Sequence, residues 1–250
     1  MLMLGKKPPK KNLRTLFLPK YTAGMLPAPP EKRAWEYVIA DDAWGMLGND
    51  TLGLCVEAAV LHYIMAATAN TKKPATFTTQ QCIDLYSAVT GYDPAQVQPD
   101  GSNPTDNGTA WTDMLAYWQK NGVYGHFILG WASIPFSDLN AIRQGIDIFG
   151  GVLIGTAVTQ SMEDQFNSGQ PWNAPFDGGV LGGHGIPAFG FGSEGETVVT
   201  WGARQPADLT LPSQFDECYV VVTQDFMENG VAPNGFNLNA LTADLKLIAA

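Results

Sequence analysis

The run from Cys55 to Thr68 constrains the fold more than any other part of this sequence. It reads CVEAAVLHYIMAAT and is apolar on nearly every face, which is typical of a helix buried within a domain. Gly48 and Gly53 precede it and predict a tight loop leading into the helix N-terminus. The rest of the chain is therefore expected to pack around this helix.

Cys55 falls in the first turn of the predicted helix. Unpaired backbone N–H groups and the helix dipole favour a thiolate at this position. A free cysteine more often packs as a small hydrophobic side chain. The residue alone therefore leaves two interpretations open, a nucleophile and a core residue.

Length and composition indicate a globular chain. Its 250 residues are 45% hydrophobic and 15% charged, enough for one large domain or two lobes. Three cysteines make no disulfide framework, which favours a reducing compartment. No stretch approaches the roughly 20 apolar residues of a membrane span, and the N-terminus lacks the pattern of a signal peptide. We expect a cytoplasmic or virion location without secretion by a signal peptide.

Charge is divided unevenly along the chain. Residues 1–33 hold eight Lys and Arg against a single Glu, a net charge of +7, whereas the remainder carries −17. Six prolines in the same segment predict an extended arm. Such an arm is expected to bind an acidic surface: another copy of the chain, a larger assembly, nucleic acid or its own domain. We favour a protein partner or self-assembly, because the acidic body argues against nucleic acid.

Periodicity predicts helices first and strands later. Helices are expected at residues 55–68, 77–90, 109–121 and 137–149, with a short one at 238–249. Short β-rich runs between glycines follow at 151–158, 185–191, 196–201 and 217–223,. This order indicates an α+β chain with two lobes. The expected organisation is an arm (1–33), a helical lobe (34–135), a β-rich lobe (136–223) and a C-terminal tail (224–250).

Only three histidines can serve as the base for a nucleophilic cysteine. His62 lies inside the buried helix and is predicted to be a packed core residue. His126 has no motif around it. His184 stands between glycines at the start of a β run, where the ring can face a cleft. A cysteine in one lobe and a histidine 129 residues later in the other is the order of a papain-type pair,.

Several segments resemble the papain-like (C1-type) cysteine peptidases in sequence and order. Asn49 stands six residues before Cys55, where that family has its oxyanion-hole glutamine. The other matching segments are Pro29–Trp35, Thr78–Leu85, Asp106–Trp111, Gln119–Val123, Phe149–Gly155, Gly183–Gly185 and Thr200–Gly202. The chain also resembles a broader group of microbial and phage proteins with a Gly-Asn-Asp…Cys loop and a Thr-Trp-Gly end.

The resemblance implies a papain-like two-lobe fold, with a helical N-terminal lobe, an antiparallel β-rich C-terminal lobe and a cleft between them. It implies a thiol hydrolase, a peptidase or amidase, that uses Cys55 and His184 on a peptide or amide substrate. The Cys55 N–H and the Asn49 side chain would form the oxyanion hole, and Trp201 would cover the pair. No cofactor, metal or membrane is expected.

Departures from the family pattern predict weak or absent activity. Leu52–Val56 lacks the upstream cysteine and following tryptophan of the family signature, and no prosegment of the usual size precedes Trp35. Val199 occupies the place of the asparagine that orients the histidine. Thr200 would replace it only if the strand register slipped by one residue. The alternative function is a catalytically silent papain-fold structural or interaction protein, such as a phage virion component with an N-terminal docking arm.

Overall fold

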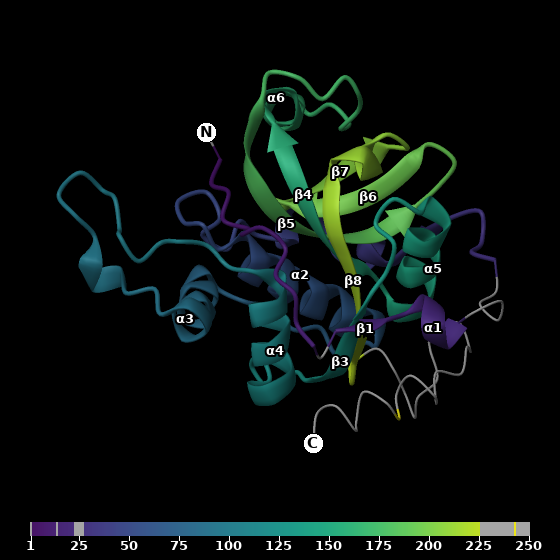
Figure 1. The fold of residues 1–250 in the computed structure, drawn as a ribbon, viewed down its shortest axis with the longest axis horizontal. Coiled ribbons are helices and arrows are strands. Elements are labelled where there is room, and N and C mark those ends of the chain that lie inside the picture. The colour runs from purple at the N-terminus through teal and green to yellow at the C-terminus, as the bar shows by residue number, and fades with distance from the viewer. Residues whose placement is uncertain (1, 14, 23–27, 226–242, 244–250) are drawn as a thin grey trace.

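The computed structural model describes residues 2–13, 15–22, 28–225 and 243, and Figure 1 shows their arrangement. Helices α2, α3 and α4 gather on one side, and a large twisted sheet with α5 and α6 forms the other side. This is the α+β, two-lobe architecture expected from the sequence. The predicted helix at 238–249 lies outside the described residues, apart from position 243.

Helix α2, Cys55–Asn70, confirms the buried helix on which the prediction was built. All its residues from Cys55 to Thr68 are buried. It packs on β5 (Val180–Phe191), where a Cβ on Gly185 would lie only 2.9 Å from the Val56 side chain. The glycine therefore lets the first turn of α2 approach the strand closely, right beside His184.

The other predicted helices of the described chain are also present. Helix α3, Thr79–Thr90, begins with a capping box between Thr78 and Gln81 and ends at Gly91 in the left-handed region,. Helix α4 is Trp111–Asn121 and α5 is Leu139–Phe149. Asp138 caps α5 from outside its first turn, through hydrogen bonds from the Asn140 and Ala141 N–H groups. Helix α6, Gln160–Asn167, was not expected. The short elements are α1 (Pro19–Thr22), η1 (Trp35–Val38), η2 (Asp41–Ala43), η3 (Pro94–Gln96) and η4 (Leu211–Gln214).

One mostly antiparallel sheet forms the β-rich side. Its order is β1-β3-β8-β4-β5-β6-β7, and β2 pairs with β5. The remaining strands are β1 (Leu16–Phe17), β2 (Arg33–Ala34), β3 (Ile128–Ser133), β4 (Val152–Thr159), β6 (Gly195–Thr200), β7 (Ala203–Asp208) and β8 (Phe215–Thr223). The sheet therefore takes β1 from the predicted arm and β3 from the predicted helical lobe. Sequence periodicity predicted neither of these two strands.

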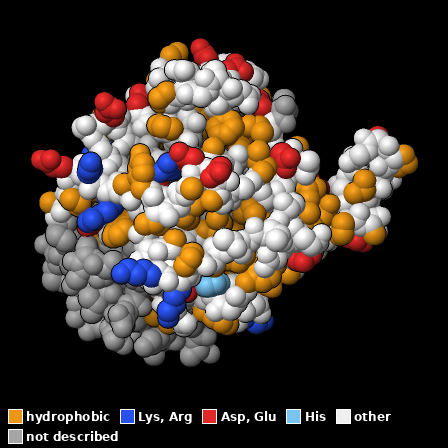
Figure 2. All heavy atoms as spheres, turned by 180° about the vertical axis from the view of Figure 1, so that it is seen from behind, with side chains coloured by type: hydrophobic (Ala, Val, Ile, Leu, Met, Phe, Trp, Pro, Cys, Tyr) orange, Lys and Arg blue, Asp and Glu red, His pale blue; other side chains and the backbone are white. Residues whose placement is uncertain are grey.

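Two hydrophobic clusters correspond to the two sides. One surrounds α2 and includes the buried side chains of Tyr63, Trp111 and Trp118. The other lies between the sheet and α5, around Ile146, Phe149 and neighbouring residues of β4. The loop that carries η3 projects from the helical side (Figures 1 and 2). On the face in Figure 2, acidic and basic side chains are interspersed.

The N-terminal segment runs along the boundary between the two sides, as the purple trace in Figure 1 shows. Lys6 forms a parallel bridge with Thr109, and its N–H donates to the Gly183 carbonyl at 3.1 Å. Lys10 pairs with Asp113 at 2.7 Å, and β1 joins the sheet edge beside β3. The predicted arm thus contains α1 and β1, and the acidic side chains that Lys6 and Lys10 contact in the structure belong to its own chain.

No helix within the described parts of the chain is long and apolar enough to cross a membrane.

Candidate active site

Cys55 is the first residue of α2 and is 1% exposed. Its Sγ accepts a hydrogen bond from the Gly185 N–H at 3.3 Å. Because Gly185 follows His184 directly in β5, this contact brings the cysteine and the predicted base to one place. Both residues line the same small cavity, whose volume of about 10 Å³ has room for about one water molecule,.

Thr200 holds the histidine. The His184 Nε2 lies 2.7 Å from the Thr200 Oγ1, and this hydrogen bond is buried. In the tautomer in which Nε2 donates, the lone pair of Nδ1 is free to take a proton. Among the described residues, Nδ1 has no hydrogen-bond partner. The expectation that Val199 leaves the ring without an orienting group is wrong.

A register shift explains why Thr200 takes this role. The β5–β6 pairing slips between Ala188 and Gly190, so that one residue of β5 is left over. Such a bulge reverses which residues of β6 share a face with the β5 side chains. Near the end of β6, it places Thr200 on the face that carries His184. Val199 is consequently packed in the cluster around α2, with 1% exposure.

Trp201 covers the His184–Thr200 pair. Its ring stacks on the imidazole with 4.5 Å between centroids and 18° between planes. Trp201 and Gly202 both have positive φ, 44° and 75°, and connect β6 to β7 through a two-residue turn. This is the pattern of a type I′ turn, which is unfavourable for a bulky residue such as tryptophan. The strained turn places the indole over the imidazole and shields its hydrogen bond from water.

Asn49 faces the arm. Its Nδ2 donates to the Met3 carbonyl at 3.3 Å and to the Leu52 carbonyl at the same distance. The Trp201 Nε1 donates to the same Met3 carbonyl at 3.4 Å. The amide predicted to bind an oxyanion therefore donates to the Met3 carbonyl of the arm instead.

Gly5 is the arm residue that lies against Cys55. Its backbone N–H is close enough to the Cys55 sulfur to lower the pKa of the thiol, and its carbonyl accepts from the Thr109 N–H at 2.8 Å. A Cβ on Gly5 would come within 1.8 Å of the Gly53 carbonyl oxygen. A Cβ on Gly108 would come within 1.9 Å of the Gly5 carbonyl oxygen. The space between Gly53 and Gly108, which we call the slot, therefore has room for backbone atoms only. Only glycine fits at position 5.

Burial sets the protonation states of Cys55 and His184. Desolvation raises the pKa of the Cys55 thiol to about 11, against the opposing hydrogen bonds from Gly185 and Gly5. Desolvation also lowers the pKa of His184 to about 3. Near neutral pH the covered pair is therefore a neutral thiol beside a neutral imidazole, without the ion pair of an active cysteine.

The remaining histidines and cysteines lie outside the Cys55–His184 pair, in contacts that hold the fold. The His62 Nε2 lies 3.0 Å from the carbonyls of Trp44 and Gly45, as expected of a packed core residue. His126 pairs with Asp225 at 2.9 Å. Cys82 and Cys218 are buried free thiols. Within the described residues, no group of three or more His, Cys, Asp or Glu side chains is placed to hold a metal ion.

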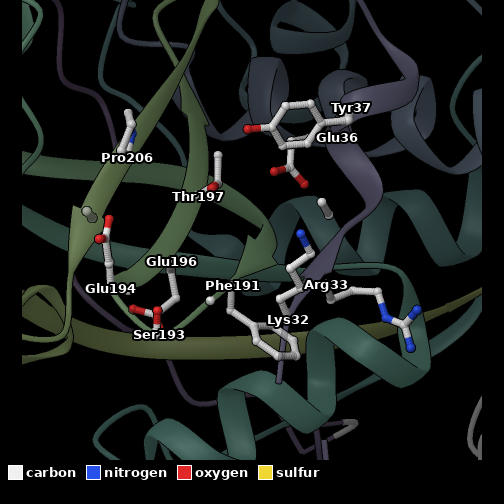
Figure 3. A pocket seen from close by; sticks show the side chains of 14 residues that line it. Lys32, Arg33, Glu36, Tyr37, Phe191, Ser193, Glu194, Glu196, Thr197 and Pro206 are labelled. Atoms are coloured by element: carbon white, nitrogen blue, oxygen red, sulfur yellow. The ribbon is translucent and has the colours of Figure 1, made fainter. Parts of the chain in front are cut away.

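A second pocket, of about 510 Å³, lies beside β2, β5 and β6 (Figure 3). It shares no lining residue with the cavity at Cys55. The fully buried Glu36 packs in it against Gly190, where a Cβ would approach its Oε1 to 2.5 Å. Burial raises the pKa of Glu36 to about 7. The acid therefore gives up its proton in the folded protein only at a higher pH than in the unfolded chain.

We expect Glu36→Gln to stabilise the protein at alkaline pH. The raised pKa of Glu36 contributes stability that is fully present below the unfolded pKa of 4.5. This contribution is lost as the pH rises through the folded pKa of about 7, because the folded state must then ionise a buried carboxyl,. Relative to wild type, the variant should gain up to about 2 kcal/mol in free energy of unfolding between pH 5 and 8. Denaturant unfolding at both pH values measures this. The exposed Glu194 of the same pocket supplies the control, Glu194→Gln, and equal pH responses of the two variants would contradict the assignment.

Known structures share this fold. Xylellain, a cysteine protease from Xylella fastidiosa, aligns with a TM-score of 0.65 and 12% identity over 88% of this chain and 96% of its own. A digestive procathepsin L 3 of Tenebrio molitor larval midgut aligns with a TM-score of 0.59 and 12% identity, over 86% and 75% of the two chains. A procathepsin B of Trypanosoma congolense aligns with a TM-score of 0.58 and 10% identity, over 89% of this chain and 87% of its own.

These alignments show that the chain has the two-lobe, papain-like α+β fold. No family model matches the sequence, and a search of curated proteins finds no match. The similarity to known proteins therefore comes from the solved structures alone. At 10–12% identity it shows a shared fold.

Sequence reasoning missed the arm residues of the site. Met3 and Gly5 lie against Asn49 and Cys55, and Asp216 and Glu217 receive the Lys6 ammonium. The sequence held one signal, the separation of a basic arm from an acidic body. It did not show that the two would meet inside one molecule.

Proposed function

We propose that this protein is a papain-like thiol hydrolase that cleaves peptide or amide bonds, with Cys55 as nucleophile and His184 as base. The arrangement of Cys55, His184 and Thr200 carries the proposal. A thiol at a helix N-terminus, an imidazole with one free nitrogen and a group on the other nitrogen are the parts that such chemistry needs. The papain-like fold of the cysteine proteases that align with this chain supports it.

The reaction follows from these groups. His184 takes the thiol proton on Nδ1, and the sulfur attacks the substrate carbonyl carbon. The Asn49 amide and the N-terminal N–H of α2 stabilise the oxyanion. His184 then gives the proton to the leaving nitrogen, the C–N bond breaks, and the amine departs to leave a thioester on Cys55. Water, activated by the same imidazole, hydrolyses the thioester to a carboxylic acid and restores the thiol.

Residues 2–10 of the arm act as an internal block in this proposal. They occupy the place of substrate backbone, and Cys55 and His184 are each 1% exposed beneath them. The enzyme is therefore silent until the arm leaves the cleft. Another protein that binds the arm would open the site.

A silent structural protein is the second candidate, and the same burial favours it. In that case the arm is a permanent part of the fold, and its displacement would destabilise the body without producing hydrolysis.

Turnover of fluorogenic peptides by a full-length Gly5→Ala variant tests the choice. The added Cβ has no space in the slot, so the arm should leave it. We expect hydrolysis that Cys55→Ala and His184→Ala each abolish in this background. Gly192→Ala is the matched control, since a Cβ there meets no atom within 4 Å. A folded Gly5→Ala protein that hydrolyses none of a broad peptide set would refute the hydrolase.

A further inference from the structure

Lys6 is the arm residue next to Gly5, and its side chain is buried beside the site. The side chain is 1% exposed, and its Nζ lies 2.7 Å from an oxygen of Asp216 and 3.0 Å from an oxygen of Glu217. Glu217 is itself only 6% exposed in its side chain, whereas that of Asp216 is 42% exposed. A buried lysine with two carboxylates is a specific arrangement, because unpaired charges are costly to bury.

A bulge in β8 brings the two carboxylates together. Neighbouring residues of a strand normally point to opposite faces. Here Gly155 pairs with Glu217 and Thr156 with Phe215, so that Asp216 is the extra residue. A bulge re-aims the side chains around it, and both carboxylates reach the same ammonium.

Asp216, Glu217 and Gly155 surround the Lys6 side chain, and we call the space between them the recess. Its geometry suits a long cationic side chain. The Tyr219 hydroxyl donates to the Glu217 Oε2 at 2.7 Å, which leaves Oε1 to the ammonium. Gly155 forms the wall: a Cβ there would come within 2.2 Å of the Lys6 side chain and 2.7 Å of the Glu217 side chain. Any other residue at position 155 would therefore fill the recess.

We infer that this recess is a specificity subsite, in which Asp216 and Glu217 select a lysine or arginine side chain of the substrate. The inference rests on the proposed function and adds the substrate class to it. In the closed protein, Lys6 of the arm occupies the place of that substrate side chain. It follows Gly5, whose backbone lies against the Cys55 sulfur. When the arm leaves, the two carboxylates face the cleft without a cation, and a basic side chain of a substrate restores the pairing.

Hydrolysis by the full-length Gly5→Ala protein gives the first test. Peptide substrates in which lysine replaces norleucine at each position in turn isolate the ammonium, because the two side chains share the same four-carbon stem. We expect lysine to raise kcat/KM at least about ten-fold at one position, and Glu217→Gln to remove that preference. Asp113→Asn is the control, since that carboxylate pairs with Lys10 outside the recess.

Binding gives a second test that does not depend on catalysis. A synthetic peptide with the sequence of residues 2–13 should bind the Gly5→Ala protein at least about ten-fold more tightly than the same peptide with norleucine in place of Lys6. Selective binding without hydrolysis of any substrate would uphold the subsite and refute the hydrolase. Hydrolysis with no preference for lysine at any position would overturn the subsite and leave the hydrolase standing. Equal binding of the two peptides, or binding of neither, would also overturn it.

Discussion

Thr200→Val is expected to lower kcat/KM of the arm-displaced Gly5→Ala enzyme by about a hundred-fold. The substitution keeps the shape of the side chain and removes the hydroxyl that holds the His184 Nε2 at 2.7 Å. Without it, neither the ring angle nor the tautomer with a free Nδ1 is fixed. Loss of the orienting group costs up to about four decades in a serine protease. A thiol ionises more readily, so the loss should be smaller here.

Rescue by Thr200→Ser separates orientation from packing. Serine keeps the hydroxyl and loses a methyl group, so it should retain most of the activity if the hydrogen bond matters. Peptide turnover across a range of pH is the measurement, because a wrongly held imidazole also changes the pH profile. Equal losses in Thr200→Val and Thr200→Ser would show that the methyl group, and thus packing, is what counts.

Val199→Asn is expected to fail as a gain of activity, contrary to the interpretation of the sequence alone. The Val199 side chain belongs to the cluster around α2 and lines the small cavity at Cys55. Thr200 already bonds the His184 Nε2, so an amide at position 199 would be buried without that role,. Increased turnover by this variant would restore the sequence-based alignment, in which position 199 faces His184.

The sequence indicated those parts of the site whose signal is local. The apolar run after Cys55, the glycines around His184 and the Thr-Trp-Gly end were enough to predict a cysteine and a histidine on different lobes. Each of these depends on a pattern of neighbouring residues, and the fold brings them together through the close approach of α2 to Gly185.

Two features could not be predicted in this way, because they depend on register and on long-range pairing. Bulges in β5 and β8 decide that Thr200 faces His184 and that Asp216 and Glu217 share one ammonium. A single extra residue in a strand leaves no reliable trace in composition. The path of the arm depends on backbone hydrogen bonds, such as that from Lys6 to Gly183, which are independent of side-chain type.

Gly5→Ala is expected to make Cys55 react with iodoacetamide at least about a hundred-fold faster than in wild type at pH 7.5, because the thiolate is the reacting form. In the wild type, burial raises the thiol pKa to about 11, so only a very small fraction is ionised at that pH. With the arm displaced, water enters, and the helix N-terminus and His184 both favour the thiolate. The alkylation rate measured against pH should therefore rise at a lower pH in the variant.

Mass spectrometry of the alkylated protein measures this rate at Cys55 separately from the other two cysteines. Cys82 and Cys218 are buried in the cores of the molecule and serve as internal controls. They should stay unmodified in both proteins if Gly5→Ala displaces the arm without unfolding the body. Gly192→Ala should react like the wild type. Fast modification of all three thiols would mean that the arm is needed for the fold, which is the expectation for a structural protein. Selective modification of Cys55 would instead support an enzyme whose own arm keeps it closed.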